Sequence, residues 1–169
     1  MRRGRQVTVE TAAGMRALGK RLAGLLQAGD LVILSGSLGA GKTTLVQGIG
    51  EGLGVRGPVT SPTFVIARIH PSLTGGPDLV HADAYRLASP AEVDDLDLDE
   101  AIDASVTVVE WGGGLAEGLA DDRLEVTITP LAATPGAEPR TVCIAGHGGR
   151  WNAVGDSAFL ALSGAPEGL

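Results

Sequence analysis

The spacing of hydrophobic residues changes several times along the chain, and each change predicts an element. Apolar residues recur at helical spacing after Thr11, which predicts an amphipathic helix that begins at this N-cap and ends at Gly29. The continuous apolar run at residues 31–34 is typical of a buried strand. A second helix is predicted over residues 43–53, with Gly54 as its C-terminal stop.

This second helix is intrinsically weak. It contains Gly48, Gly50 and Gly52, each of which costs about 1 kcal/mol relative to alanine in a helix interior. We therefore expect tertiary packing, together with a bound phosphate, to hold the helix in place.

The rest of the chain predicts mainly strands. They are expected at residues 64–69, 79–82, 105–111, 124–129 and 141–145. The first two are joined by a turn at residues 71–77, which suggests an antiparallel hairpin. A weak helix is expected between residues 114 and 119. The pattern therefore predicts a single α/β domain over residues 1–150, followed by a loosely ordered tail at residues 151–169.

A glycine-rich turn connects the first buried strand to the second helix. Its sequence, Gly36-Ser37-Leu38-Gly39-Ala40-Gly41-Lys42-Thr43, matches the phosphate-loop pattern G-x-x-x-x-G-K-[ST] without a mismatch. In such a loop the backbone N–H groups surround the phosphates of a nucleotide, the lysine reaches the β- and γ-phosphates, and the hydroxyl is placed to bind Mg²⁺. The chain has only two lysines, Lys20 and Lys42, so the one in the loop does not reflect abundance.

Two acids follow predicted strands. Asp83 comes just after the strand at 79–82, where a carboxylate could orient an attacking water or hold the water shell of magnesium. Glu110 lies at the end of the strand at 105–111, where a Walker B element usually has an aspartate, and would face the metal. His81 is predicted to be a hydrogen-bonded strand histidine. The acidic segment 92–103 is either a solvated helical face or a docking face.

Composition limits the partners and the compartment. The chain has 169 residues and a net charge of −7, which argues against direct binding to nucleic acid, so that any contact with RNA must pass through a partner. Its one cysteine, Cys143, cannot form an internal disulfide and is expected to be buried in a strand. No apolar run approaches membrane-spanning length, and we expect a cytoplasmic protein with no membrane contact.

The motifs also narrow the class of nucleotide-binding protein. Neither lysine lies in an [NT]-K-x-D sequence, so adenine is favoured over guanine. A small-molecule kinase would carry several arginines in a lid, but only Arg123 lies between Trp111 and Pro139. Hydrolysis of ATP is therefore favoured over a kinase reaction.

Four motifs in this order and spacing resemble those of the bacterial TsaE (YjeE) family of small ATPases. They are the phosphate loop through Thr44, Ser61-Pro62-Thr63-Phe64, the segment His81-Ala82-Asp83-Ala84-Tyr85-Arg86-Leu87, and Glu110-Trp111. The resemblance implies a P-loop NTPase-like mixed sheet of parallel and antiparallel strands flanked by helices. It also implies bound ATP and Mg²⁺, and action in threonylcarbamoyladenosine formation in tRNA together with the TsaD and TsaB proteins. Contact with tRNA would be indirect, through that complex.

The resemblance also implies roles for individual residues. Lys42, Asp83 and Glu110 would be catalytic, and Thr43 and Glu110 would bind the metal. The nucleotide would be bound by Ser37, Leu38, Gly39, Ala40, Gly41, Lys42, Thr43, Thr44, Thr63, Arg86 and Trp111.

Two functional classes stay open. The chain is either an ATPase, slow by itself and dependent on its partners, or a nucleotide-gated binding module whose hydrolysis is incidental. The presence of both Asp83 and Glu110 favours the ATPase, because a module that only binds nucleotide needs no second carboxylate.

Overall fold

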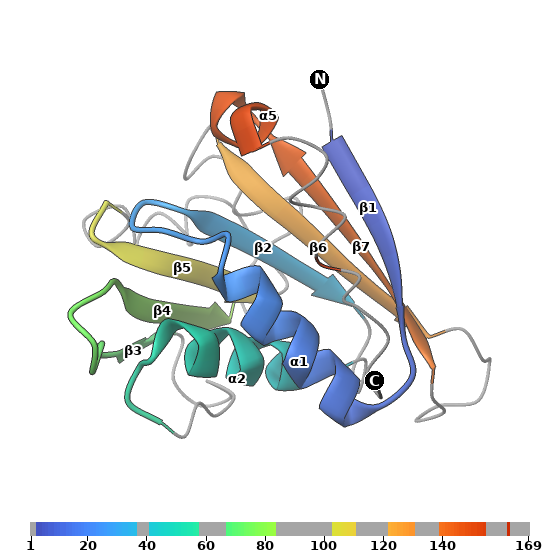
Figure 1. The fold of residues 1–169 in the computed structure, drawn as a ribbon, viewed down its shortest axis with the longest axis horizontal. Helices are drawn as coiled ribbons and strands as arrows, with labels where there is room; N and C mark the ends of the chain where they lie inside the picture. The colour runs from blue at the N-terminus through green and yellow to red at the C-terminus, as the bar shows by residue number, and fades with distance from the viewer. Residues whose placement is uncertain are drawn as a thin grey trace, which may run out of the picture.

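The computed structural model describes residues 3–36, 41–57, 67–83, 103–110, 122–130, 139–154 and 162. Within these residues the chain forms a seven-stranded sheet in the order β1-β7-β6-β2-β5-β4-β3 (Figure 1). The strands are β1 (Arg3–Val9), β2 (Leu31–Gly36), β3 (Ala67–His70), β4 (Asp78–Asp83), β5 (Ser105–Glu110), β6 (Arg123–Pro130) and β7 (Arg140–His147). The helices are α1 (Ala12–Ala23), α2 (Lys42–Leu53) and α5 (Gly149–Val154).

The centre of the sheet is parallel and its margins are antiparallel. β2 pairs in parallel with β5 on one side and β6 on the other, and β4 continues the parallel set beside β5. β1, β7 and β3 add antiparallel pairs at the two sides. Every residue of β5 is buried, as are the first four of β2, because parallel strands are covered on both faces. The predicted fold class, a mixed sheet flanked by helices, is confirmed.

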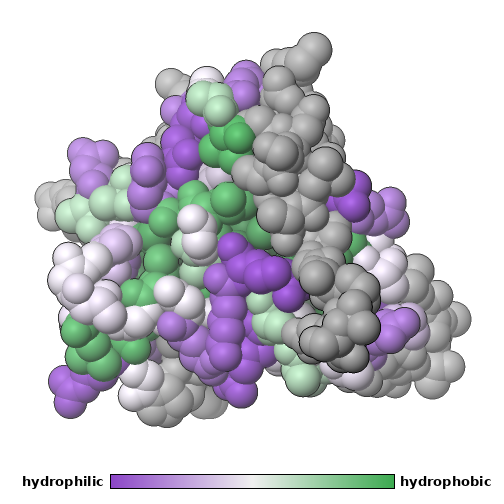
Figure 2. All heavy atoms as spheres, in the orientation of Figure 1, coloured by the Kyte–Doolittle hydropathy of each residue, from purple (hydrophilic) through white to green (hydrophobic). Residues whose placement is uncertain are grey.

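The helices α1 and α2 lie side by side across one face of the sheet (Figure 1). Thr11 caps α1 as predicted, since its side-chain oxygen accepts a hydrogen bond from the backbone N–H of Gly14 at 2.9 Å. On the outer side of the helix pair, Arg16 and Lys20 of α1 form ion pairs with Glu51 of α2. Hydrophilic side chains accordingly form a band over the two helices in the space-filling view (Figure 2).

Glycines allow α1 and α2 to approach each other closely. A Cβ atom added to Gly48 would lie 2.1 Å from the backbone oxygen of Arg16, and one added to Gly19 would lie 2.4 Å from that of Leu45. At Gly52 a Cβ atom would come within 2.9 Å of the α1 backbone. The glycines that weaken α2 as an isolated helix are therefore the residues that let it pack against α1.

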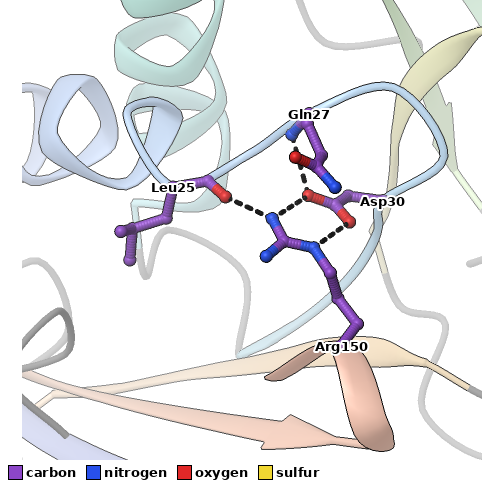
Figure 3. A network of polar contacts seen from close by, with 4 residues as sticks. All are labelled: Leu25, Gln27, Asp30 and Arg150. Carbon is purple, nitrogen blue, oxygen red and sulfur yellow. Dashed lines mark hydrogen bonds and ion pairs between the residues drawn. The ribbon is translucent and has the colours of Figure 1, made fainter. Parts of the chain in front are cut away.

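A partly buried ion pair ties the start of β2 to α5 (Figure 3). Arg150 donates hydrogen bonds from Nε and Nη2 to the two carboxylate oxygens of Asp30, at 3.1 and 3.0 Å. The same Nη2 donates to the backbone oxygen of Leu25 at 2.7 Å, and the backbone N–H of Gln27 donates to Asp30 at 2.8 Å. The guanidinium group also lies 4.6 Å from the ring centre of Trp151. These contacts fix the loop that leads from α1 into the phosphate-loop strand.

Several elements differ from the sequence-based prediction. β1 was not predicted, because only Val7 and Val9 of this strand are apolar and buried. α1 ends at Ala23 and not at Gly29. Cys143 was expected to be buried, but it is exposed, because the alternation of β7 turns it away from the core face.

The C-terminal region contains structure on both sides of residue 150. α5 begins at residue 149. The side chain of Trp151 is completely buried, and Leu162 is 1% exposed. The predicted domain boundary stays a prediction. The acidic segment at residues 92–102 and the helix expected at 114–119 lie outside the described residues. In the segments that the structure describes, none of the helices has the length and apolar character needed to cross a lipid bilayer.

Substitution of Gly48 by alanine should lower the free energy of unfolding by about 2 kcal/mol, although helix propensity alone would raise it by about 1 kcal/mol. The reason is the overlap of the new methyl group with the backbone of α1. Urea denaturation measures the change. Gly149→Ala is the control, because open space surrounds this position, and it should stabilise the protein by about 0.5 kcal/mol. Stabilisation by both substitutions would show that the helices are not in close contact.

Substitution of Arg150 by methionine should lower the free energy of unfolding by about 2–3 kcal/mol, because the Asp30 carboxylate would stay buried without its paired charge. Lys20→Met is the matched control. Its ion pair with Glu51 is exposed, so the loss should be below about 1 kcal/mol. Equal losses in the two variants, measured by urea denaturation at neutral pH, would contradict the importance of the Asp30 pair.

Candidate functional site

The carboxyl ends of the parallel strands meet at one edge of the sheet. β2 ends at Gly36, β4 at Asp83 and β5 at Glu110, and the backbone register pairs Asp83 with Glu110. β7 runs in the opposite direction, so its first residue, Arg140, pairs with Pro130 at this same edge. Ligands of open α/β sheets bind outside the carboxyl ends of the strands, which makes this edge the candidate site.

The first turn of α2 presents backbone N–H groups at this edge. Gly41 is the N-cap residue, and its φ of 105° lies in the left-handed region that favours glycine. Among the described residues, no side chain caps this helix. Lys42, Thr43 and Thr44 form its first turn, whose N–H groups have no partner within the helix and carry the positive end of the helix dipole. The local structure therefore suits an anion such as phosphate.

The side chain of Lys42 turns back toward the end of β2. It is 6% exposed, and Nζ donates a hydrogen bond to the backbone oxygen of Gly36 at 2.8 Å. The ammonium group thus lies between the last residue of β2 and the first turn of α2. A cation held where water is scarce attracts an anion more strongly than it would in bulk water.

Glu110 is held by a histidine from the neighbouring strand. The carboxylate is 4% exposed, and its Oε2 atom lies 2.5 Å from Nε2 of His81, which is completely buried. An ionised carboxylate only accepts hydrogen bonds, so this contact assigns a proton to Nε2. Among the described residues Nδ1 of His81 has no hydrogen-bond partner. The prediction of a hydrogen-bonded strand histidine is confirmed, and its partner is the predicted metal ligand.

A second histidine lies near this pair. His70 of β3 is 8% exposed. Burial is the main cause that lowers the pKa of His70 below its ordinary value, and the charges of His81 and Arg68 lower it further. A hydrogen bond with the backbone of Arg56 raises the pKa but does not outweigh these causes. His70 is therefore neutral at physiological pH and adds no charge beside His81.

The oxygen donors at this edge fit a magnesium ion. Within the described ranges no group of three or more His, Cys, Asp or Glu residues could hold a metal by itself. Magnesium does not need such a group, because it keeps several waters and is bound by one or two protein oxygens together with substrate phosphates. Thr43, in the first turn of α2, and Glu110, at the end of the adjacent β5, carry oxygen donors of this kind.

Arg140 is a candidate that sequence reasoning missed. Its Cδ atom lies 3.9 Å from the position that a Cβ atom on Gly41 would occupy, and Met15 of α1 lies 3.4 Å from the same position. The arginine is thus beside the phosphate loop, on the side of β2 opposite to β5. An antiparallel return of the last predicted strand would have placed its first residue at this edge, but the sequence does not specify that direction.

Several predicted residues lie outside the described part of the chain. They are Ser37, Leu38, Gly39, Ala40, Thr63, Arg86 and Trp111. Asp83 is described in its backbone only, which ends β4 beside Glu110. The structure therefore brings Gly41, Lys42, Thr43 and Thr44 to the same edge of the sheet as Glu110. The roles of these residues, like those of the others, stay predictions.

The chain is similar to proteins of one family. The sequence model of the protein family described as "Threonylcarbamoyl adenosine biosynthesis protein TsaE" matches residues 9–136 of this chain. The tRNA threonylcarbamoyladenosine biosynthesis protein TsaE of Streptomyces coelicolor is 60% identical over 148 residues, which cover 87% of this chain and 99% of that relative. The TsaE protein of Bacillus subtilis is 40% identical over 114 residues, covering 67% of this chain and 70% of the relative. The crystal structure of Bacillus subtilis YdiB has a TM-score of 0.73 at 28% identity and covers 96% of both chains.

Proposed function

The chain belongs to the TsaE family, and on this basis we propose that it is an ATPase for threonylcarbamoyladenosine formation in tRNA. It binds ATP with Mg²⁺, hydrolyses it slowly by itself, and works in a complex with TsaD and TsaB. The observation that supports nucleotide binding is the turn from β2 into α2, where the uncapped helix start and the Lys42 ammonium group lie together. The net charge of −7 supports contact with tRNA only through the complex.

The residues at the carboxyl edge have separate tasks in this proposal. The N–H groups of the first turn of α2 bind phosphate oxygens, and Lys42 moves its hydrogen bond from Gly36 to the β- and γ-phosphates. Thr43 and Glu110 would hold a magnesium ion, which would supply positive charge next to the phosphates. Asp83, at the end of β4, accepts the proton of the attacking water.

The orientation of the nucleotide follows from the two sides of the loop. Glu110 belongs to β5, on one side of β2, so a metal ion held by Glu110 would lie toward that side. The base and sugar would then extend toward β6 and β7, where Met15 and Arg140 lie beside Gly41. A guanidinium group can stack on a nucleobase, and Met15 offers an apolar surface next to it. Arg140 would therefore contact the base of a bound nucleotide.

The proposed activity is tested by phosphate release from ATP. The isolated chain should be slow, and TsaD with TsaB should raise its rate by about 10³-fold, as groups or ordering supplied by a partner do in other phosphoryl-transfer systems. Lys42→Ala should abolish the release and weaken ATP binding at least about 10-fold, because the charged hydrogen bond to phosphate is lost. Lys20→Ala, the chain's other lysine, is the control. Turnover of many per second without partners, or equal binding by both variants, would refute the proposal.

The position of Arg140 is tested with two ligands. Arg140→Ala should weaken MgATP binding about 10-fold and leave the binding of magnesium tripolyphosphate, which has no base, unchanged. Arg123→Ala is a matched control, because the backbone of Arg123 pairs with that of His147 at the opposite end of β6 and β7, away from the candidate site. Equal weakening of both ligands by Arg140→Ala, measured by calorimetry, would place the side chain on the phosphates and not on the nucleoside.

A further inference from the structure

The hydrogen bond between His81 and Glu110 assigns a further task to the histidine. We propose that His81 is a positioning residue, which fixes the Glu110 carboxylate so that its other oxygen faces the magnesium ion. The inference deepens the proposed function and rests on it. No group in the described part of the chain forms a hydrogen bond with Oε1 of Glu110, whereas Oε2 is held by Nε2 of His81.

The two residues are placed for this task by the strand register. β4 and β5 are parallel neighbours, and the Cα partner of His81 is Val108, two residues before Glu110. Side chains two residues apart in a strand point to the same face, so the histidine of β4 reaches the end of β5 diagonally. Because the imidazole ring is completely buried, packing leaves it little freedom to rotate. A glutamate side chain has three rotatable bonds, so its carboxylate can take many orientations. The hydrogen bond from the fixed histidine ring restricts the carboxylate to few of them.

A purely structural role explains the pair less well. Burying a histidine and a carboxylate removes both from water, and apolar residues of similar size usually stabilise a core as well or better. Nδ1 of His81 is also buried without a partner among the described residues. A side chain kept only for stability would be expected to satisfy both ring nitrogens. Carboxylates that bind metals are, in contrast, regularly oriented by a hydrogen bond from a neighbouring residue.

His81 is not itself a suitable ligand. Magnesium strongly prefers oxygen donors, and the ring nitrogen that faces the edge is engaged by Glu110. The histidine therefore acts through the carboxylate and has no contact of its own with metal or nucleotide. This predicts a defect in metal-dependent binding and none in metal-independent binding.

The test compares the affinity for the imido analogue of ATP with Mg²⁺ and with EDTA, by calorimetry. His81→Met should reduce the gain in affinity that Mg²⁺ provides by about 10-fold to 100-fold and leave the affinity in EDTA unchanged. His81→Gln, whose amide N–H can reach the same carboxylate oxygen, should restore most of the gain. In a Glu110→Gln background His81→Met should have no further effect, because its effect passes through the carboxylate.

Circular dichroism and urea denaturation show whether each variant is folded. If His81→Met does not fold, His81→Asn replaces it, because its amide is too short to reach Glu110. The positioning role would be overturned if Mg²⁺ raised the affinity of His81→Met or His81→Asn as much as that of the unaltered chain. It would also be overturned if His81→Met reduced the gain from Mg²⁺ equally in the Glu110→Gln background. In both cases the proposed function stands. If the unaltered chain gains nothing from Mg²⁺, the metal site of the proposed function fails and this inference fails with it.

Discussion

The parallel pairing of β2 with both β5 and β6 is the constraint on which the site depends. Parallel neighbours end at the same edge of the sheet. The strand pairing alone therefore brings together the end of β2, the acid at the end of β5 and the end of β4. The same pairing requires β2 and β5 to be buried on both faces, which explains their nearly continuous apolar sequences. The hydrophobic pattern and the chemistry of the edge therefore have one cause.

The helix that begins at the phosphate loop is held by packing and not by its own propensity. Gly48 costs stability in an isolated helix, yet it allows the α2 backbone to approach the backbone of Arg16. At the opposite end of β2 the Asp30–Arg150 pair fixes the entry of the strand. The phosphate loop thus lies between a strand that is anchored at its start and a helix that is locked against its neighbour, and this arrangement limits the positions open to Lys42.

Local signals predicted much of the fold and the centre of the site. The cap at Thr11, the hairpin of β3 and β4, the strand that ends at Glu110 and the loop lysine each have a pattern within a few residues. Features that depend on which strands become neighbours could not be predicted in this way. The contact of His81 with Glu110 requires β4 to lie beside β5, and the position of Arg140 requires an antiparallel β7. β1 and α5 were missed because few apolar residues mark them.

The pairing of β1 with β7 joins the first and last strands in the described part of the chain, with Val9 opposite Arg140. Such contacts between distant residues make folding slow, because the entropy of closing a long loop is lost before the contact forms. On the ribosome, α1 and α2 are available early and can pack against each other, whereas β2 must wait for β5 and β6, and β1 waits longer still for β7. The nascent chain therefore carries β2 and α2 for most of its synthesis without the strands that neighbour β2 in the folded sheet, and the carboxyl edge of the sheet assembles only when translation is nearly complete.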